Sequence, residues 1–223
     1  MSEFQDRASV LAAFRAERCS AILRTPLADA VWPALEAAIE GGFRIVEVTM
    51  NTPGALGHIE RLARSDGIVA GAGTVLSLSD AKAAMKAGAR FLVSPVTDPQ
   101  ILAFCRQHDL VAVPGAYTPT EMMAAHRAGA DFVKLFPAPA DGPTYLRACR
   151  GPLPFLDIYP TSGVTEQNVE EWFRAGAFGV GFVGSLFDPA DLASGRFDLV
   201  RERASRMIGR VRAAIAAGSA PGG

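Results

Sequence analysis

Arg127-Ala128-Gly129-Ala130, followed by Asp131-Phe132-Val133-Lys134-Leu135-Phe136-Pro137, is the stretch of this 223-residue chain that says most about its fold. An alanine-rich amphipathic segment ends here at a glycine, and a short apolar run begins. That is the pattern of a helix that ends at a C-terminal glycine and is followed by a buried parallel strand. The same junction recurs around Gly42, Gly88 and Gly176, at spacings of 41 to 47 residues. Such spacings suit two strand–helix units per period.

Working outward from these junctions, the apolar runs predict eight strands. They cover residues 20–24, 44–49, 68–71, 91–94, 111–114, 132–136, 156–160 and 179–183, with a helix over 6–18 before them and a last helix over 197–217. We therefore expect one α/β domain over residues 1–223, a (β/α)8 TIM barrel with an extra N-terminal helix. The alternative is a doubly wound open sheet. Its dinucleotide fingerprint is missing, because no third glycine follows Gly71-Ala72-Gly73 where that fingerprint needs one.

The composition excludes several classes of protein. The net charge is -1 with mixed signs along the chain, so neither a nucleic acid nor a membrane surface is an expected partner. The apolar runs are strand-sized, and residues 1–7 lack the apolar core of a signal peptide. The three cysteines, Cys19, Cys105 and Cys149, show no paired spacing. We expect a cytoplasmic protein with reduced cysteines.

Lys134 is the most unusual ionisable residue of the chain. Only three of the 22 lysine and arginine residues are lysines, and Lys82 and Lys86 lie one turn apart in a polar helix. Lys134 instead has large apolar neighbours on both sides. Burial disfavours the ammonium form, which makes the neutral amine available as a nucleophile that forms Schiff bases with carbonyl compounds. The alternative is a structural lysine paired with a carboxylate or reaching out from a strand end.

In a barrel, the active site forms where the strands end. The predicted strand ends carry groups that bind anions and move protons: Arg24, Glu47, Thr49, Asn51, Thr74, Ser94, Pro95, Lys134, Thr161, Ser162 and Gly163. This set has no histidine, and Glu47 is its only acid. We therefore expect no metal site and no cofactor.

Glu47 lies in the apolar strand Ile45-Val46-Glu47-Val48-Thr49. Alternation along the strand places Glu47 and Thr49 on the same inward face as Ile45. A buried carboxylate needs a partner, and we expect Lys134 and Arg24 to be the nearest buried cations. Glu47 is either half of a structural ion pair or an acid/base beside an amine nucleophile.

Two loops are candidates for binding a phosphate group. Thr161-Ser162-Gly163 follows the seventh predicted strand, and Gly184-Ser185 follows the eighth. Loops at these positions of a barrel commonly bind phosphate through backbone N–H groups. The alternative is that the glycines only close tight turns.

These residues resemble the class I aldolases that act on 2-keto-3-deoxy-6-phosphogluconate, on the phosphogalactonate epimer or on 4-hydroxy-2-oxoglutarate. The resemblance covers nearly the whole chain and is carried by motifs in order: Ala21-Ile22-Leu23-Arg24, Glu47-Val48-Thr49, Gly71-Ala72-Gly73-Thr74-Val75, Ser94-Pro95, Pro114-Gly115, Val133-Lys134-Leu135-Phe136-Pro137, Gly142-Pro143 and Pro160-Thr161-Ser162-Gly163-Val164.

The resemblance implies a role for each site residue. Lys134 would form the Schiff base, and Glu47 would be the general acid/base. Arg24 would hold the substrate carboxylate, whereas Thr74, Pro95 and Phe136, with Thr49 nearby, would line the pyruvate pocket. The phosphate would bind at Thr161, Ser162, Gly163, Gly184 and Ser185. The family also implies a homotrimer and no metal.

Three departures from the family pattern bear on the substrate. Some members have an arginine where Asn51 stands, so carboxylate binding must depend on Arg24. Ser162 replaces the first of two usual glycines, and the Gly-Ser pair after the last strand matches only if Gly184-Ser185 is shifted by one residue. Thr161 favours the gluconate epimer, while Asn51 followed by Pro53 favours the galactonate epimer.

The sequence thus predicts an aldolase that cleaves 2-keto-3-deoxy-6-phosphogluconate to pyruvate and glyceraldehyde 3-phosphate. The galactonate and hydroxy-oxoglutarate reactions are alternatives with the same chemistry. A non-catalytic phosphosugar-binding barrel is a further alternative, but it would not need the Lys134 and Glu47 pair. A phosphosugar isomerase would normally need a second acid/base or a metal.

Overall fold

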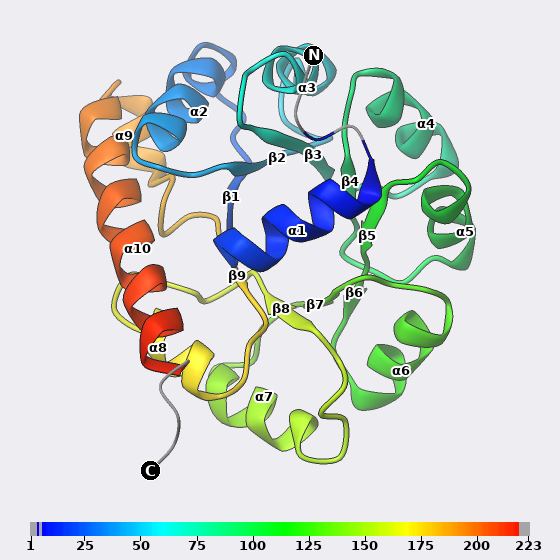
Figure 1. Ribbon diagram of the computed structural model, residues 1–223. Coiled ribbons are helices and arrows are strands. Elements are labelled where there is room, and N and C mark those ends of the chain that lie inside the picture. Colours follow the sequence, from blue (N-terminus) through cyan, green and yellow to red (C-terminus); the bar gives the residue numbers. More distant parts are fainter. Residues whose placement is uncertain (1–3, 5, 219–223) are drawn as a thin grey trace.

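The computed structural model describes residue 4 and residues 6–218, which form an α/β fold with strands at the centre and helices around them (Figure 1). The strands are β1 (Cys19–Leu23), β2 (Ile45–Thr49), β3 (Val69–Gly73), β4 (Phe91–Val93), β5 (Val111–Val113), β6 (Gly115–Ala116), β7 (Val133–Leu135), β8 (Ile158–Pro160) and β9 (Val180–Phe182). Six of them form one curled parallel sheet in the order β5-β4-β3-β2-β1-β9, and the other three form a parallel sheet in the order β6-β7-β8. The predicted α/β fold with a parallel sheet is confirmed.

Helices follow the strands along the chain. They are α1 (Arg7–Glu17), the 3-10 helix η1 (Ala28–Ala30), α2 (Val31–Glu40), α3 (Ala55–Ala63), α4 (Leu78–Lys86), α5 (Pro99–Gln107), α6 (Pro119–Arg127), α7 (Gly142–Arg150), α8 (Val169–Arg174), α9 (Pro189–Ala193) and α10 (Phe197–Gly218). Side-chain oxygens cap several of their N-termini. In α6, for example, Glu121 N–H donates to Thr118 Oγ1 at 3.3 Å, and Glu121 Oε2 accepts from Thr118 N–H at 2.8 Å, which is a capping box.

The four junction glycines behave as the sequence predicts. Gly42, Gly88, Gly129 and Gly176 have φ values of 113°, 97°, 95° and 95°, in the region that side chains rarely adopt. Each lies between a helix and the following strand, so the helix ends there and the chain turns back into the sheet.

Each of the eight predicted strands overlaps an observed strand, but one break was not predicted. The strand expected over residues 111–114 ends at Val113, and the separate two-residue strand β6 begins at Gly115. Pro114 lies between them and has no backbone N–H to donate, which explains the interruption of the ladder. Its carbonyl still accepts a hydrogen bond from Lys134 N–H at 2.9 Å.

The apolar core has two parts. The larger part packs the outer faces of the strands against the surrounding helices. The smaller part fills the space enclosed by the strands, with Phe91, Phe132 and Tyr159 from the sheets and Val10 and Phe14 from α1. Helix α1 crosses the end of the strands that faces the viewer in Figure 1. Because apolar side chains fill the N-terminal end of the interior, a polar site can form only towards the C-terminal ends of the strands.

No helix in the described part of the chain is both long enough and apolar enough to cross a lipid bilayer.

Candidate active site

Two oppositely charged side chains are buried where the strands end. Glu47 lies on β2 with 2% of its surface exposed, and Lys134 lies on β7 with 3% exposed. Alternation along each strand turns both side chains inward, since Val46, Val48, Val133 and Leu135 belong to the outer core. The sequence prediction that both residues are buried is confirmed.

Two glycines of β3 leave room for the side chains of Glu47 and Phe91. Parallel pairing sets Glu47 opposite Gly71 and Thr49 opposite Gly73. A Cβ atom at Gly73 would lie 1.7 Å from Glu47 Oε1, and a Cβ atom at Gly71 would lie 2.2 Å from the ring of Phe91. The Glu47 carboxylate therefore lies across the backbone of β3, where no side chain fits.

Burial and mutual attraction act in opposite directions on the pair. Burial raises the pKa of Glu47, while the positive charges of Lys134 and Arg24 oppose that rise. Burial lowers the pKa of Lys134; the negative charge of Glu47 opposes this, and Arg24 adds to it. Both groups are thereby moved toward their neutral forms, which makes the Lys134 amine a better nucleophile at a given pH.

The surroundings of Lys134 are apolar and aromatic. Its Nζ lies 4.9 Å from the ring centroid of Phe136. Such a face attracts the ammonium form and shields it from water. Glu47 Oε1 has no hydrogen-bond partner among the described residues. An acceptor oxygen without a partner can take up a proton from a bound substrate.

Arg24 is not buried, contrary to the expectation from the sequence. It follows the last residue of β1 and is exposed, because the strand ends at Leu23 and the chain there turns toward solvent. Its Nη2 donates a hydrogen bond to Thr74 Oγ1 at 3.1 Å. Thr74 has a φ of 56°, an uncommon value for a β-branched residue. The structure thus brings Arg24 and Thr74 together at the mouth of the site.

Two further predicted residues lie on the neighbouring strand ends. Thr49 is fully buried, and its hydroxyl is 3.0 Å from the hydroxyl of Thr52, which in turn donates to Leu23 O at 3.4 Å. Pro95 is half-buried after β4, and its carbonyl closely faces Gly115, where a Cβ atom would lie 2.3 Å from that oxygen. The Thr49 hydroxyl therefore helps to fix the end of β2, and the Pro95 carbonyl packs against β6.

The loops after β8 and β9 are tied to each other and to the lysine strand. Ser162 Oγ accepts a hydrogen bond from Ala138 N–H at 3.1 Å, and Ser185 Oγ donates to Val164 O at 2.7 Å. Thr161 is buried beneath them, whereas Gly163 and Gly184 are exposed, with nothing within 4 Å of an added Cβ atom. The two glycines leave open space, and the two serines hold the loops around it.

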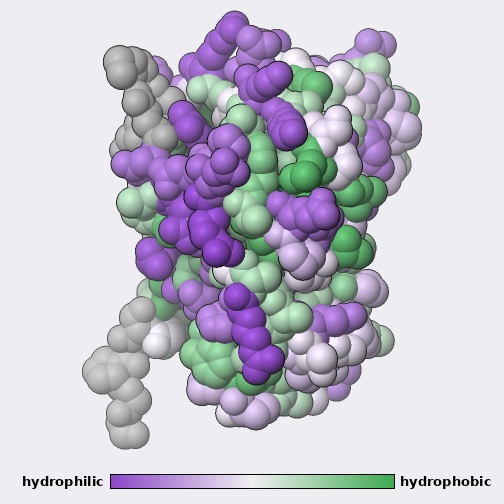
Figure 2. Space-filling model, turned by 90° about the vertical axis from the view of Figure 1, so that its right-hand side faces the viewer, coloured by the Kyte–Doolittle hydropathy of each residue, from purple (hydrophilic) through white to green (hydrophobic). Residues whose placement is uncertain are grey.

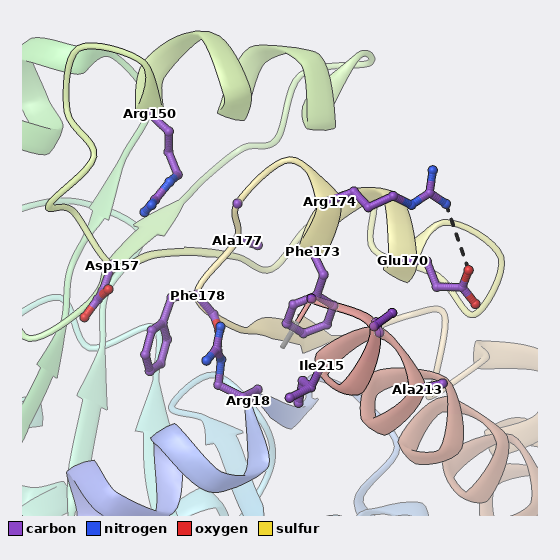
Figure 3. Close-up of a pocket in the computed structure, with 14 residues that line it drawn as sticks. Arg18, Arg150, Asp157, Glu170, Phe173, Arg174, Ala177, Phe178, Ala213 and Ile215 are labelled. Carbon is purple, nitrogen blue, oxygen red and sulfur yellow. Dashed lines mark hydrogen bonds and ion pairs between the residues drawn. The ribbon is translucent and has the colours of Figure 1, made fainter. Parts of the chain in front are cut away.

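A hollow lies at the other end of the strands. It has a volume of about 800 Å³ and is lined by Arg18, Arg150, Asp157, Phe178 and the last turns of α10, among others (Figure 3). Arg18 and Asp157 immediately precede β1 and β8, which marks the N-terminal end. Arg150 Nη1 donates to Leu156 O at 2.7 Å and Arg18 Nε donates to Phe178 O, so both guanidinium groups bond to backbone carbonyls. This hollow does not contain the lysine and carboxylate pair.

Some features of the site were not predicted. Tyr159 and Ser20 are each 2% exposed; Tyr159 is the register partner of Lys134, and Ser20 lies two residues before Ile22, the register partner of Glu47. Alternation with Thr161 could have indicated that Tyr159 points inward. The described residues contain no group of three or more His, Cys, Asp or Glu side chains that could hold a metal ion.

Comparisons with known proteins show which family the chain resembles. The family model described as "KDPG and KHG aldolase" matches residues 10–202. A probable 2-dehydro-3-deoxy-6-phosphogalactonate aldolase of Rhizobium meliloti is 35% identical over 187 residues, covering 82% of this chain and 86% of that protein.

Two solved structures extend the comparison. The KDPG aldolase of Legionella pneumophila, with pyruvate captured as a covalent carbinolamine intermediate, has a TM-score of 0.79 and 27% identity, covering 88% of this chain and 97% of that one. A cube-shaped protein cage designed by fusing symmetric oligomeric domains has a TM-score of 0.81 and 29% identity, covering 90% of this chain and 74% of that one.

The fold and the match together define an aldolase, that is, a carbon–carbon lyase. The chain belongs to the KDPG and KHG aldolase family.

Proposed function

We propose that this protein is a class I aldolase that cleaves 2-keto-3-deoxy-6-phosphogluconate to pyruvate and glyceraldehyde 3-phosphate. The observation that carries the proposal is the buried Lys134 amine, whose pKa is lowered by burial, together with the buried Glu47 carboxylate, whose charge acts on it. The covalent pyruvate intermediate captured in the Legionella pneumophila relative supports the same chemistry here.

In the proposed mechanism, Lys134 Nζ attacks the C2 carbonyl of the substrate, and loss of water gives an imine. The imine draws the electron pair of the C3–C4 bond as that bond breaks, and Glu47 takes the proton from the C4 hydroxyl. Glyceraldehyde 3-phosphate leaves. The remaining enamine takes up a proton at C3, and water hydrolyses the imine to release pyruvate and the free amine.

The remaining residues would bind the two anionic ends of the substrate. Arg24, which donates a hydrogen bond to Thr74, would pair with the carboxylate, and Phe136 and Pro95 would flank the pyruvate portion. The phosphate would bind at the loops after β8 and β9, where Gly163 and Gly184 leave open space. Ser162 accepts from Ala138, so its own hydroxyl proton remains available to an anion.

The substrate assignment is tested by steady-state kinetics on a matched set of compounds. We expect the phosphogluconate compound to exceed its dephosphorylated counterpart in kcat/KM by roughly 100-fold or more, because remote binding energy can be used at the transition state. Ser162→Gly should change this preference only modestly, whereas Ser162→Asp should abolish it by charge repulsion.

Two alternative substrates are tested in the same assay. Galactonate specificity is favoured by the Rhizobium meliloti relative, and a higher kcat/KM for the phosphogalactonate epimer would replace the gluconate assignment. Equal efficiency with and without phosphate would instead favour a 4-hydroxy-2-oxoglutarate aldolase.

We also propose that the strands close into a (β/α)8 barrel that forms one domain. Support comes from the junctions between the two sheets: Phe178 N–H donates to Ile158 O at 2.9 Å, next to β9 and β8, and only Pro114 separates β5 from β6. A cytoplasmic location is supported by Cys19, Cys105 and Cys149, which are buried, free thiols.

A homotrimer is supported by an apolar rim, defined here as Leu76, Val96 and Tyr117, which are 57%, 53% and 37% exposed. These residues follow β3, β4 and β6 at their C-terminal ends, and Figure 2 shows hydrophobic surface gathered on the side away from the grey terminal residues. A second copy of the chain would cover the rim, as the oligomeric domains of the designed cage suggest. Leu76→Asp with Val96→Asp should dissociate the oligomer in light scattering. Phe155→Asp, at an equally exposed residue before β8, should leave it intact.

A further inference from the structure

Tyr159 is a buried phenol that the proposed mechanism does not use. It lies on β8, where parallel pairing sets it directly opposite Lys134 of β7. It is 2% exposed, and its hydroxyl has no hydrogen-bond partner of good geometry among the described residues. Glu47 Oε1 is likewise buried without a hydrogen-bond partner among the described residues. Buried polar atoms are nearly always satisfied by protein or ordered water, so these two inward-facing atoms require an explanation.

The backbone around Tyr159 directs its ring toward β1. A Cβ atom at Gly179 would lie 2.6 Å from Tyr159 Cε2, so the ring lies across the chain that leads into β9. Beyond that chain is Ser20 of β1, which pairs with Gly181 of β9. The sides of the ring pack on Phe14 and Phe132, at centroid distances of 5.9 Å and 6.3 Å. These apolar contacts hold the ring in place.

Ser20 and Glu47 lie on the neighbouring strands β1 and β2 and both face inward. Ile22 of β1 pairs with Glu47 of β2, and Ser20 lies two residues before Ile22 on the same inward face. Ser20 is 2% exposed. Three buried polar groups, from β8, β1 and β2, therefore face one part of the interior, beneath the place where the substrate would bind.

The groups that act on the pKa of Tyr159 include Ser20 and Glu47. Burial raises the pKa of Tyr159 well above its usual value, the negative charges that Cys19 and Glu47 can carry add to the rise, and Ser20 and Arg18 oppose it.

We propose that Tyr159 is a positioning residue for Glu47: its hydroxyl, together with that of Ser20, holds one enclosed water that donates a hydrogen bond to Glu47 Oε1. Such a water needs about three polar partners, which these side chains provide. A donor to the carboxylate favours its ionised form and fixes the oxygen that exchanges protons with the substrate. This inference rests on the proposed function, because it assigns Tyr159 a role through Glu47.

The test is the pH dependence of proton exchange at C3 of pyruvate. With pyruvate saturating, Lys134 is already in the imine, and deuterium enters C3 from D2O through Glu47. The exchange rate therefore reports the ionisation of Glu47, which faces Lys134 and Arg24 as well as the Tyr159 and Ser20 hydroxyls. Tyr159→Phe keeps the ring but removes the donor. We expect its acid limb to move to higher pH by about one unit, because the ionised carboxylate loses a hydrogen bond.

Two further variants make the result specific. Ser20→Ala should move the acid limb in the same direction by a smaller amount, and it tests the proposal even if Tyr159→Phe folds poorly. In the Glu47→Gln background, Tyr159→Phe should cause no additional loss of exchange, since its effect acts through Glu47. An unchanged acid limb in both single variants, or an equal loss in the Glu47→Gln background, would overturn the proposal.

Borohydride trapping of pyruvate separates this inference from the proposed function. If the parent protein and Tyr159→Phe both trap pyruvate on Lys134 but share the same pH profile, only the role of Tyr159 is wrong. If the parent protein traps no pyruvate, the proposed function itself fails.

Discussion

At the scale of single residues, the chemistry depends on how burial changes two ionisable groups. Lys134 and Glu47 each lose hydration, and each partly offsets that loss for the other. An ordinary surface lysine is almost fully protonated at neutral pH and is a poor nucleophile. A lysine with a lowered pKa in an apolar space can attack a carbonyl carbon. The carboxylate beside it can then move the protons that imine formation and bond cleavage require.

Glu47→Gln tests the role of the carboxylate. The amide has nearly the same shape but cannot take up the proton, so we expect turnover to fall by roughly two to four orders of magnitude. Steady-state assays of pyruvate release measure this. Glu60→Gln, on the exposed face of α3, is the matched control and should retain parental turnover. A Glu47→Gln variant nearly as fast as the parent would show that Glu47 has only a structural role.

The pH dependence of imine formation follows from the direction of the Lys134 shift. Only the neutral amine attacks, so the trapping rate should rise with pH through the pKa of Lys134 and level off below the usual lysine value of 10.5. The negative charge of Glu47 raises the pKa of Lys134. Glu47→Gln should therefore move the midpoint of this rise to lower pH, even though the maximum rate falls. A midpoint that stays in place or moves upward would contradict the proposed coupling.

Lys134 and Glu47 could be predicted from the sequence because each is the one ionisable residue in an otherwise apolar strand. The exposure of Arg24 could not be predicted, because it depends on β1 ending one residue earlier than expected. Tyr159 and Ser20 could not be predicted either, because an inward tyrosine in a strand is usually part of the core. The role proposed for Tyr159 and Ser20 depends on which strands are neighbours in the sheet, and this is not encoded locally.

At the scale of secondary-structure elements, β3 determines the shape of the site. It lies beside β2, and its glycines leave room for the carboxylate of Glu47 and the ring of Phe91. Gly71-Ala72-Gly73 is a weak sequence signal that would suit a phosphate loop equally well. The structure gives it a different purpose, which is close approach of side chains from the neighbouring strands.

Gly73→Ala tests this purpose directly. A methyl group there would lie 1.7 Å from Glu47 Oε1, so the carboxylate must move. A displacement of about 1 Å in a catalytic group can reduce turnover roughly 100-fold, and we expect a loss of that order. Gly209→Ala is the control, because its added methyl group meets nothing within 4 Å on the exposed face of α10. It should stabilise the helix by about 0.5–1 kcal/mol without affecting turnover.

The strands themselves could be predicted because all eight read as apolar runs and four of them follow a helix-ending glycine. The interruption by Pro114 was missed, since a proline at a strand end cannot be told from a proline inside a strand by composition alone. The hydrogen bond from Ala138 to Ser162 was missed for a different reason. It joins loops 24 residues apart, and nothing local to either loop indicates it.

At the scale of the whole molecule, apolar and polar residues divide the interior into two ends. Helix α1 and the aromatic side chains fill the N-terminal end, and the ionisable pair lies toward the C-terminal ends of the strands. The hollow lined by Arg18, Arg150 and Asp157 lies at the N-terminal end, away from this pair. The division into two ends explains why residues far apart in the sequence meet: strands from all parts of the chain end at one face.

Chelation tests whether the proposed chemistry is sufficient. The imine itself draws electrons from the breaking bond, so the mechanism needs no metal ion for that step. Activity should survive dialysis against EDTA and should not rise when zinc or magnesium is returned. The free concentration of each metal must be controlled during the assay. Activity lost in EDTA and restored by one of these ions would contradict the mechanism.

The most direct measurement is mass spectrometry of the protein after treatment with pyruvate and borohydride. Borohydride reduces an imine to a stable amine, so the account predicts a single pyruvate adduct on the peptide that contains Lys134. Lys134→Arg should show no adduct and no cleavage activity, because a guanidinium does not deprotonate in proteins. An adduct on Lys82 or Lys86 instead, or cleavage without any adduct on Lys134, would contradict the account.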